Sequence, residues 1–184
     1  ERRILMALPD LPDEDTEREM YYMTRNCLGE QGYERYEISN YARPGFECRH
    51  NVGYWTGTGY LGLGLGASSY LEGCRFHNTS DFQSYVSAHF DDKAEFNQTL
   101  RQDFEQLSVK SKMEEFMFLG LRLTRGVSAE GFITRFGQSI RNVYGGVIDK
   151  LEREGLLEHK NGYYRLTERG LDLSNYAMSL FLLD

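Results

Sequence analysis

Apolar residues recur at helical spacing near both ends of the chain. Acidic residues crowd positions 13–17, Met20, Tyr21 and Met23 follow at the intervals of a helix face, and Gly29 or Gly32 would end that helix. In the last third, the same spacing predicts helices over residues 112–124, 129–136 and 139–154, the second of them capped by Ser128. The chain therefore begins and ends with amphipathic helical segments.

The last helices lead into a different pattern. Asn161-Gly162 separates two short runs, residues 156–159 and 163–166, and predicts a β-hairpin with a tight turn. A final helix is expected from Thr167 to the apolar residues 180–183. Three helices, a hairpin and a last helix are typical of a winged-helix module. Its expected core is Phe116, Leu119, Phe132, Ile140, Val143, Ile148, Leu151, Leu156 and Tyr164.

The middle of the chain alternates less regularly. Residues 33–39 alternate as in a strand, and residues 40–55, which contain Pro44-Gly45, indicate a structured loop. The glycine-dense apolar residues 60–70 predict a buried strand that runs into a loop, and residues 79–90 predict a short helix. Residues 91–107 are polar and indicate a linker. We therefore expect an α+β protein with domains at 1–107 and 108–184.

Composition and charge narrow the classes of function. Of 184 residues, 40% are apolar and 27% charged, which is typical of a globular chain. No apolar run approaches the roughly 20 residues of a membrane-spanning helix. The net charge is −7, which disfavours nonspecific nucleic-acid binding. In the helix that would read DNA, Arg141, Lys150 and Arg153 stand beside Asp149, Glu152 and Glu154, so DNA binding remains the weaker alternative.

Three cysteines, Cys27, Cys48 and Cys74, are too widely spaced for a C-x-x-C site. They favour a reducing, cytoplasmic setting and cannot by themselves hold an iron–sulfur cluster. The chain also starts without Met, at Glu1-Arg2-Arg3, which indicates a cut from a longer protein.

Two segments carry residues suited to ligand chemistry. The glycines from 57 to 66 fit G-x-G-x-x-G only formally, because no helix would follow; they are better explained by close approach of a ligand or backbone to residues 64–68. The sequence His50-Asn51-Val52-Gly53-Tyr54-Trp55 joins an imidazole to two large rings, which could bind haem. Alternatively, His50 and Asn51 hold a loop together while Trp55 fills the core.

Three motifs occur in order: residues 36–45 (YEISNYARPG), 50–55 (HNVGYW) and 60–70 (YLGLGLGASSY). As a set they resemble the oxygen-independent coproporphyrinogen III oxidase family of radical SAM proteins. The intact H-N-x-x-Y-W motif is most similar to the haem-chaperone branch of that family. The rest of the chain is similar to the end of the family's barrel, followed by its C-terminal helical domain.

This resemblance implies a parent protein with a partial β/α barrel, in which C-x-x-x-C-x-x-C holds a [4Fe-4S] cluster that reduces S-adenosylmethionine. Residues 1–107 would complete the barrel, and residues 108–184 would be the winged-helix-like domain. By motif position, Gly66, Ala67 and Ser68 would line the S-adenosylmethionine pocket. His50, a possible iron ligand, would bind haem together with Tyr54 and Trp55.

The resemblance leaves two activities open. The parent would bind haem and pass it to a haemoprotein, or it would oxidise coproporphyrinogen III to protoporphyrinogen IX. The cluster-binding cysteines are absent from this stretch, so we expect it to be inactive alone and to hold neither cluster nor S-adenosylmethionine. Its expected partners are haem or a porphyrinogen and a haemoprotein acceptor, with no nucleic acid and no transmembrane segment.

Overall fold

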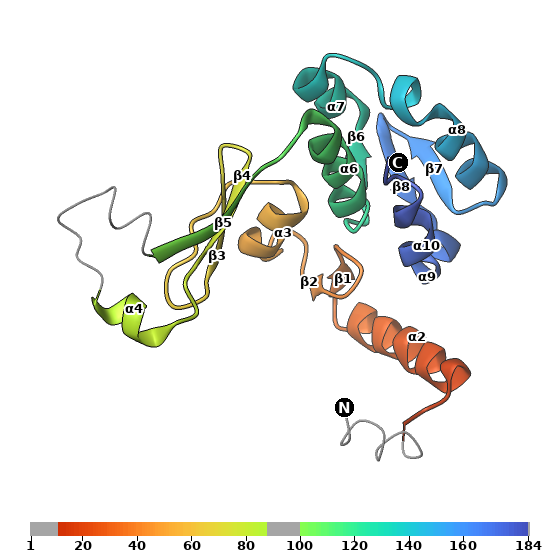
Figure 1. The fold of residues 1–184 in the computed structure, drawn as a ribbon. Helices are drawn as coiled ribbons and strands as arrows, with labels where there is room; N and C mark the ends of the chain where they lie inside the picture. Colours follow the sequence, from red (N-terminus) through yellow and green to blue (C-terminus); the bar gives the residue numbers. More distant parts are fainter. Residues whose placement is uncertain (1–10, 88–99, 184) are drawn as a thin grey trace. The chain divides into compact units, whose positions relative to one another are not determined.

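A computed structural model describes residues 11–87 and 100–183 of the chain. It contains both helices and antiparallel sheets (Figure 1). The chain divides into two compact units, residues 1–48 and 49–184, which are described separately below. The predicted domain boundary at 107/108 stays a prediction. Within the described ranges, no helix has both the length and the apolar character needed to cross a membrane.

The first unit contains one long helix and a small two-stranded sheet. Helix α2 (Glu14–Glu30) begins where the sequence predicts, because the Asp13 carboxylate accepts a hydrogen bond from the Thr16 backbone N–H at 2.8 Å. The same bond lowers the pKa of Asp13. Strand β1 (Glu34–Arg35) pairs with β2 (Tyr41–Ala42). The predicted strand 33–39 is therefore too long.

Glu37 explains why that strand stops early. Its carboxylate accepts hydrogen bonds from the Ser39 backbone N–H at 2.9 Å and from the Asn40 side-chain amide. These bonds turn the chain back on itself immediately after β1, so residues 36–40 form the connection to β2 instead of extending the strand.

The second unit starts with helix α3 (Arg49–Trp55), which lies where the sequence predicts only a loop. A three-stranded antiparallel sheet follows, in the order β3 (Ser68–Leu71), β4 (Cys74–Asn78) and β5 (Arg101–Gln106). Helix α4 (Phe82–Ser87) begins three residues after the start of the predicted helix over 79–90, of which residues 88–90 lie outside the described ranges.

Strand β5 corrects the expected linker over 91–107, of which residues 91–99 lie outside the described ranges. Five of its six residues are exposed, so it shows no apolar alternation from which a strand could be predicted. Backbone pairing with β4 holds it in place, and the Phe104 ring stacks on Phe76 at 5.2 Å between centroids.

Residues 60–70 also differ from the prediction. Tyr60 and Tyr70 form an isolated antiparallel bridge, and the residues between them loop outward with Leu63 84% exposed. The Asn78 side-chain amide donates hydrogen bonds to the Gly62 and Gly64 carbonyl oxygens at 3.3 and 2.8 Å, which fixes this loop. The expected buried strand is therefore an exposed glycine-rich loop that ends in β3.

The C-terminal part follows the predicted order. Helices α6 (Val109–Gly120), α7 (Ala129–Phe136) and α8 (Ile140–Arg153) precede the hairpin of β7 (Leu157–Lys160) and β8 (Tyr163–Leu166), and short β6 (Val127–Ser128) pairs with β8 (Figure 1). The predicted single last helix is instead two helices, α9 (Glu168–Asp172) and α10 (Ser174–Ser179). Leu173, at φ −108° and ψ 28°, interrupts them.

Aromatic rings fill the core of this part. Phe132 is fully buried and contacts Phe116 and Phe136 at 5.3 and 4.7 Å between centroids, and Tyr144 contacts Phe181 at 5.3 Å. Of the predicted core, Phe116, Leu119 and Val143 are half-buried, and the structure buries Phe132, Ile140, Ile148, Leu151, Leu156 and Tyr164. Met117, which faces inward from the helix as its spacing predicts, and Phe181 are also fully buried.

Candidate functional site

Helix α3 presents the candidate haem-binding histidine to solvent. His50 is exposed, and its ring meets the Tyr54 ring edge-on at 4.6 Å between centroids. The two residues are four apart, which places them on one side of a helix. Tyr54 meets Tyr60 edge-on at 4.8 Å. The result is a row of three rings that begins at an accessible imidazole.

Asn51 and Trp55, also four residues apart, lie on a different side of α3. Asn51 Oδ1 and Trp55 Nε1 are buried, and neither has a hydrogen-bond partner among the described residues. The Arg122 guanidinium lies 4.2 Å from the Trp55 ring centroid. Because His50 is exposed and Asn51 Oδ1 has no such partner, the alternative in which both residues hold a loop together finds no support.

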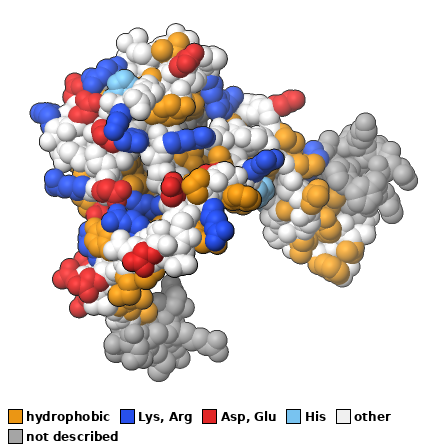
Figure 2. All heavy atoms as spheres, turned by 180° about the vertical axis from the view of Figure 1, so that it is seen from behind, with side chains coloured by type: hydrophobic (Ala, Val, Ile, Leu, Met, Phe, Trp, Pro, Cys, Tyr) orange, Lys and Arg blue, Asp and Glu red, His pale blue; other side chains and the backbone are white. Residues whose placement is uncertain are grey.

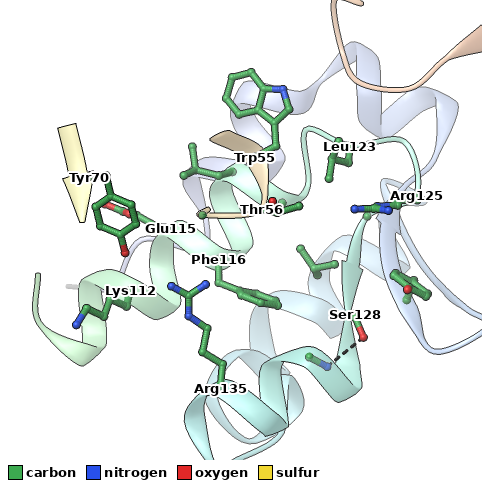
Figure 3. Close-up of a pocket in the computed structure, with 17 residues that line it drawn as sticks. Trp55, Thr56, Tyr70, Lys112, Glu115, Phe116, Leu123, Arg125, Ser128 and Arg135 are labelled. Atoms are coloured by element: carbon green, nitrogen blue, oxygen red, sulfur yellow. Dashed lines mark hydrogen bonds between the residues drawn. The ribbon is translucent and has the colours of Figure 1, made fainter. Parts of the chain in front are cut away.

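A cleft of about 240 Å³ opens beside Trp55 (Figure 3). It lies between the end of α3, helix α6, the segment leading into β6, and α7. Phe116, Leu119 and Leu123 give it apolar walls, together with Trp55. Its complete lining is Trp55, Thr56, Gly57, Tyr70, Lys112, Glu115, Phe116, Leu119, Gly120, Leu123, Arg125, Gly126, Val127, Ser128, Gly131, Arg135 and Tyr163.

The charged side chains of the cleft are mostly basic. Lys112, Arg125 and Arg135 are cations, and Glu115 is the one acidic residue of the lining. Glu115 is bound to Arg75 by an ion pair of 2.8 Å. Burial raises the pKa of Glu115, and the nearby positive charge of Arg75 opposes that rise. The cleft therefore keeps a surplus of positive charge in a chain whose net charge is −7.

A second hollow, of about 220 Å³, adjoins the cleft. It is lined by Tyr54 and Tyr60 from the ring row, and it shares Trp55, Tyr70 and Glu115 with the cleft. The ring row that starts at His50 thus leads toward the cleft. His50 itself does not line either hollow.

The structure places Gly66, Ala67 and Ser68 elsewhere. They lie where the glycine loop enters β3, with the Gly66 N–H donating to Thr79 O at 3.0 Å and Ala67 O accepting from the Asn78 N–H at 2.9 Å. Gly66 and Ser68 are exposed. Of the three predicted haem-binding residues, only Trp55 lines the cleft, and none of the predicted S-adenosylmethionine residues does.

Sequence analysis missed the basic residues of the cleft. Lys112 and Glu115 are three residues apart on α6, and Leu119 follows four residues later, so one helix face mixes charge with apolar surface. That mixed face is the sequence feature from which a ligand-binding surface on α6 could have been predicted. Arg135 comes from a different helix, and nothing in the local sequence links it to Trp55 or Gly57.

Neither a metal centre nor a nucleic-acid surface stands out. In residues 11–87 and 100–183, no group of three or more His, Cys, Asp or Glu side chains is arranged to hold a metal ion. In Figure 2, basic and acidic side chains are interspersed over the face shown. On α8, Arg141 is bound to Asp149 and Glu152 at 2.7 and 2.8 Å, so this basic side chain of the candidate DNA-reading helix is already neutralised.

Comparison with known proteins identifies the C-terminal part. Residues 107–173 match the HemN C-terminal domain family. This part of the chain is therefore similar to a HemN C-terminal domain. It contributes α6, α7 and β6 to the cleft. The family resemblance predicted from the three motifs is thereby confirmed.

The similarity extends over most of the chain. It is 40% identical over 174 residues to the haem chaperone HemW of Lactococcus lactis and 35% identical over 172 residues to that of Bacillus subtilis. These matches cover 95% and 94% of this chain but 44% of each relative. A solved structure of coproporphyrinogen III oxidase (HemN) from Escherichia coli, described as a radical SAM enzyme, matches with a TM-score of 0.68 at 17% identity. That match covers 95% of this chain and 42% of the other, and it shows a shared fold.

Proposed function

We propose that this chain takes part in binding haem and delivering it, as part of a haem chaperone. The observation that carries the proposal is the exposed His50 imidazole at the start of a row of aromatic rings. Two relatives that are 40% and 35% identical to the chain are named haem chaperones, which supports the proposal. The proposed acceptor is a haemoprotein, to which the bound haem would pass.

The residues present fit a haem group. Haem would supply an iron that a neutral imidazole can ligate. His50 is accessible for that role, and Tyr54 holds the His50 ring from the side. Tyr60 and Trp55 extend an aromatic surface from this point, against which a flat apolar ring system could pack.

We further propose that the parent protein is a radical SAM protein with a [4Fe-4S] cluster, to which this chain contributes the end of a partial β/α barrel and a winged-helix-like domain divided near residue 107. The mixed fold shared with HemN supports the architecture. Gly66, Ala67 and Ser68 would line the S-adenosylmethionine pocket. The exposure of Gly66 and Ser68 beside the edge strand β3 fits that role.

Haemin titration of the full chain tests the proposal. We expect saturable binding with a Soret band that shifts from that of free haemin, because imidazole ligation changes the field at the iron. His50→Ala should remove the shift and weaken binding about tenfold, while thermal stability changes little because His50 is exposed.

His159→Ala is the matched control for this titration. His159 is also exposed and also rests against a tyrosine, Tyr164, at 4.3 Å between centroids, but it lies on β7, away from α3. Its loss should leave the Soret band unchanged. Equal spectra for wild type and His50→Ala, or equal losses in both variants, would contradict the proposed role of His50.

A further inference from the structure

The cleft beside Trp55 combines two features that the aromatic row does not explain. Its walls are apolar, from Trp55, Phe116, Leu119 and Leu123. Its charged groups include Lys112, Arg125 and Arg135, none of which forms an ion pair within the part of the chain that the structure describes. Cations that form no ion pair, beside apolar walls, favour a ligand that is itself amphipathic and anionic.

Lys112 and Arg135 gather at one end of this cleft. In Figure 3 the Arg135 side chain reaches from α7 toward Glu115, and the Tyr70 hydroxyl points to the space between Arg135 and Lys112. Arg125 lies at the opposite side of the view. An ammonium, a guanidinium and a hydroxyl are all hydrogen-bond donors, so this end can bind carboxylate oxygens.

Two glycines leave room for these cations. A Cβ on Gly57 would lie 3.3 Å from Arg135 Nη1, so the guanidinium rests on the Gly57 backbone. A Cβ on Gly73 would lie 2.5 Å from Lys112 Nζ. Both glycines have positive φ, 67° and 78°, which side chains rarely adopt. Gly57 lines the cleft, so it places the Arg135 guanidinium there. The Lys112 ammonium lies against Gly73, in an adjoining hollow that Lys112 and Arg135 also line.

The nearby acid does not cancel this charge. Glu115 faces the same end of the cleft, but Arg75 already binds its carboxylate at 2.8 Å. The Arg135 charge also acts on this carboxylate, but less than the charge of Arg75, and Arg135 forms no ion pair with it. Lys112 and Arg135 therefore keep hydrogen-bond donors for an incoming anion. A small hydrated anion would leave the apolar walls uncovered, whereas a carboxylate carried on an apolar body satisfies both parts of the cleft.

We infer that this cleft binds a carboxylate on an apolar body, with the carboxylate at Lys112 and Arg135 and the apolar part against Trp55 and Phe116. This inference deepens the proposed function and rests on it where the ligand is haem, whose propionate arms are such carboxylates. A free apolar carboxylic acid offers the same chemistry from another source.

The test measures porphyrin binding by the full chain through the fluorescence of Trp55, the one tryptophan of the sequence. Iron-free protoporphyrin IX is the probe, so that ligation by His50 plays no part. The double variant Lys112→Gln/Arg135→Gln should weaken its binding about tenfold or more. The dimethyl ester of protoporphyrin IX should bind wild type and double variant alike, because it carries no carboxylate.

Arg153→Gln is the matched control, because Arg153 is an exposed cation on α8 that lines neither the cleft nor the adjoining hollows. It should leave the affinity for protoporphyrin IX unchanged. Raising the salt concentration should weaken wild type more than the double variant, since screening acts on the charges that the variant lacks.

Further binding measurements distinguish a failure of this inference from a failure of the proposed function. Haemin binding that depends on His50 but not on Lys112 and Arg135 would overturn the inference and leave the proposed function standing. Laurate binding that depends on the two cations, with no haemin binding, would support the cleft and contradict the proposed function. Competition by inorganic phosphate at the affinity of laurate would overturn the assignment to carboxylates.

Discussion

Tyr144 combines almost complete burial with an unpaired hydroxyl. The residue is 1% exposed, and no hydrogen-bond partner for its Oη lies among the described residues. Its ring is packed between Phe132 and Phe181. Burial raises the pKa of Tyr144 to about 12, and the charge of Glu114 adds to the rise. The ring contributes to the core, whereas the hydroxyl opposes folding because it loses its water.

Replacing this tyrosine separates the two effects. Tyr144→Phe keeps the ring and removes the hydroxyl, so we expect the free energy of unfolding at pH 7 to stay equal or to rise by up to about 1 kcal/mol. Urea unfolding measures it. Tyr163→Phe is the control, since that tyrosine is exposed and should change stability by less than about 0.5 kcal/mol. A loss of more than about 1 kcal/mol in Tyr144→Phe would mean that the hydroxyl has a partner.

The stability of the same variant should also depend on pH differently from that of wild type. Because the pKa of Tyr144 is raised in the folded state, the unfolded chain loses this proton first, and stability falls as pH rises from about 10 to about 12. A rise of the pKa from 10.0 to about 12 corresponds to roughly 2–3 kcal/mol. Tyr144→Phe should show a correspondingly smaller loss of stability over that range than wild type. Parallel pH profiles would contradict the assigned pKa.

At the scale of elements, the hairpin turn shows a local backbone requirement. Asn161 and Gly162 both have positive φ, 53° and 80°, as a tight two-residue turn between β7 and β8 demands. Gly146, by contrast, lies inside helix α8 with nothing within 4 Å of the position of a Cβ. Alanine is therefore expected to be unfavourable at position 162 and favourable at position 146.

Replacing each of these glycines by alanine should change the free energy of unfolding in opposite directions. Gly162→Ala places a side chain in the left-handed region and should lower the free energy of unfolding by about 1–2 kcal/mol. Gly146→Ala should raise it by about 0.5–1 kcal/mol, because alanine favours the helix more than glycine does. Equilibrium urea unfolding compares them, and a stabilised Gly162→Ala would contradict the turn geometry.

These elements also show where sequence patterns predict structure and where they do not. Asn161-Gly162 and the cap residue Asp13 act on adjacent backbone, so their positions could be predicted. Strand β5 depends on backbone pairing with β4, and its exposed residues show no sequence pattern from which that pairing could be predicted. Of the candidate site, His50 stands in a recognisable motif. The meeting of Arg135 with Gly57 requires two segments to pack together, which no local pattern encodes.

At the scale of the whole molecule, the three cysteines lie in separate elements. Cys27 is in α2, Cys48 precedes α3, and Cys74 begins β4. Cys27 and Cys48 belong to the first compact unit and Cys74 to the second. A cubane cluster needs thiolates that converge on one centre. The chain also spans 44% of the length of the relatives named above, so its cofactors belong to the proposal about the parent protein.

Iron analysis tests this reasoning. After anaerobic reconstitution with iron and sulfide, we expect the chain to hold less than one iron per molecule and to bind S-adenosylmethionine only weakly in equilibrium dialysis. In a longer protein that carries the cluster, Gly66→Val should weaken that binding, with Gly29→Ala on α2 as the control. Four irons per chain, or equal binding by Gly66→Val, would contradict the assignment of these residues.

The contact between Gly120 and Val127 limits how the cleft can change. A Cβ on Gly120 would collide with Val127 Cγ1, so the Val127 side chain packs directly on the bare backbone at the end of α6. Both residues line the cleft. A side chain at position 120 would therefore displace Val127 and with it the start of β6. Lys112, Arg125 and Arg135 take no part in this contact, so the charge of the cleft can change through evolution while its packed wall stays the same.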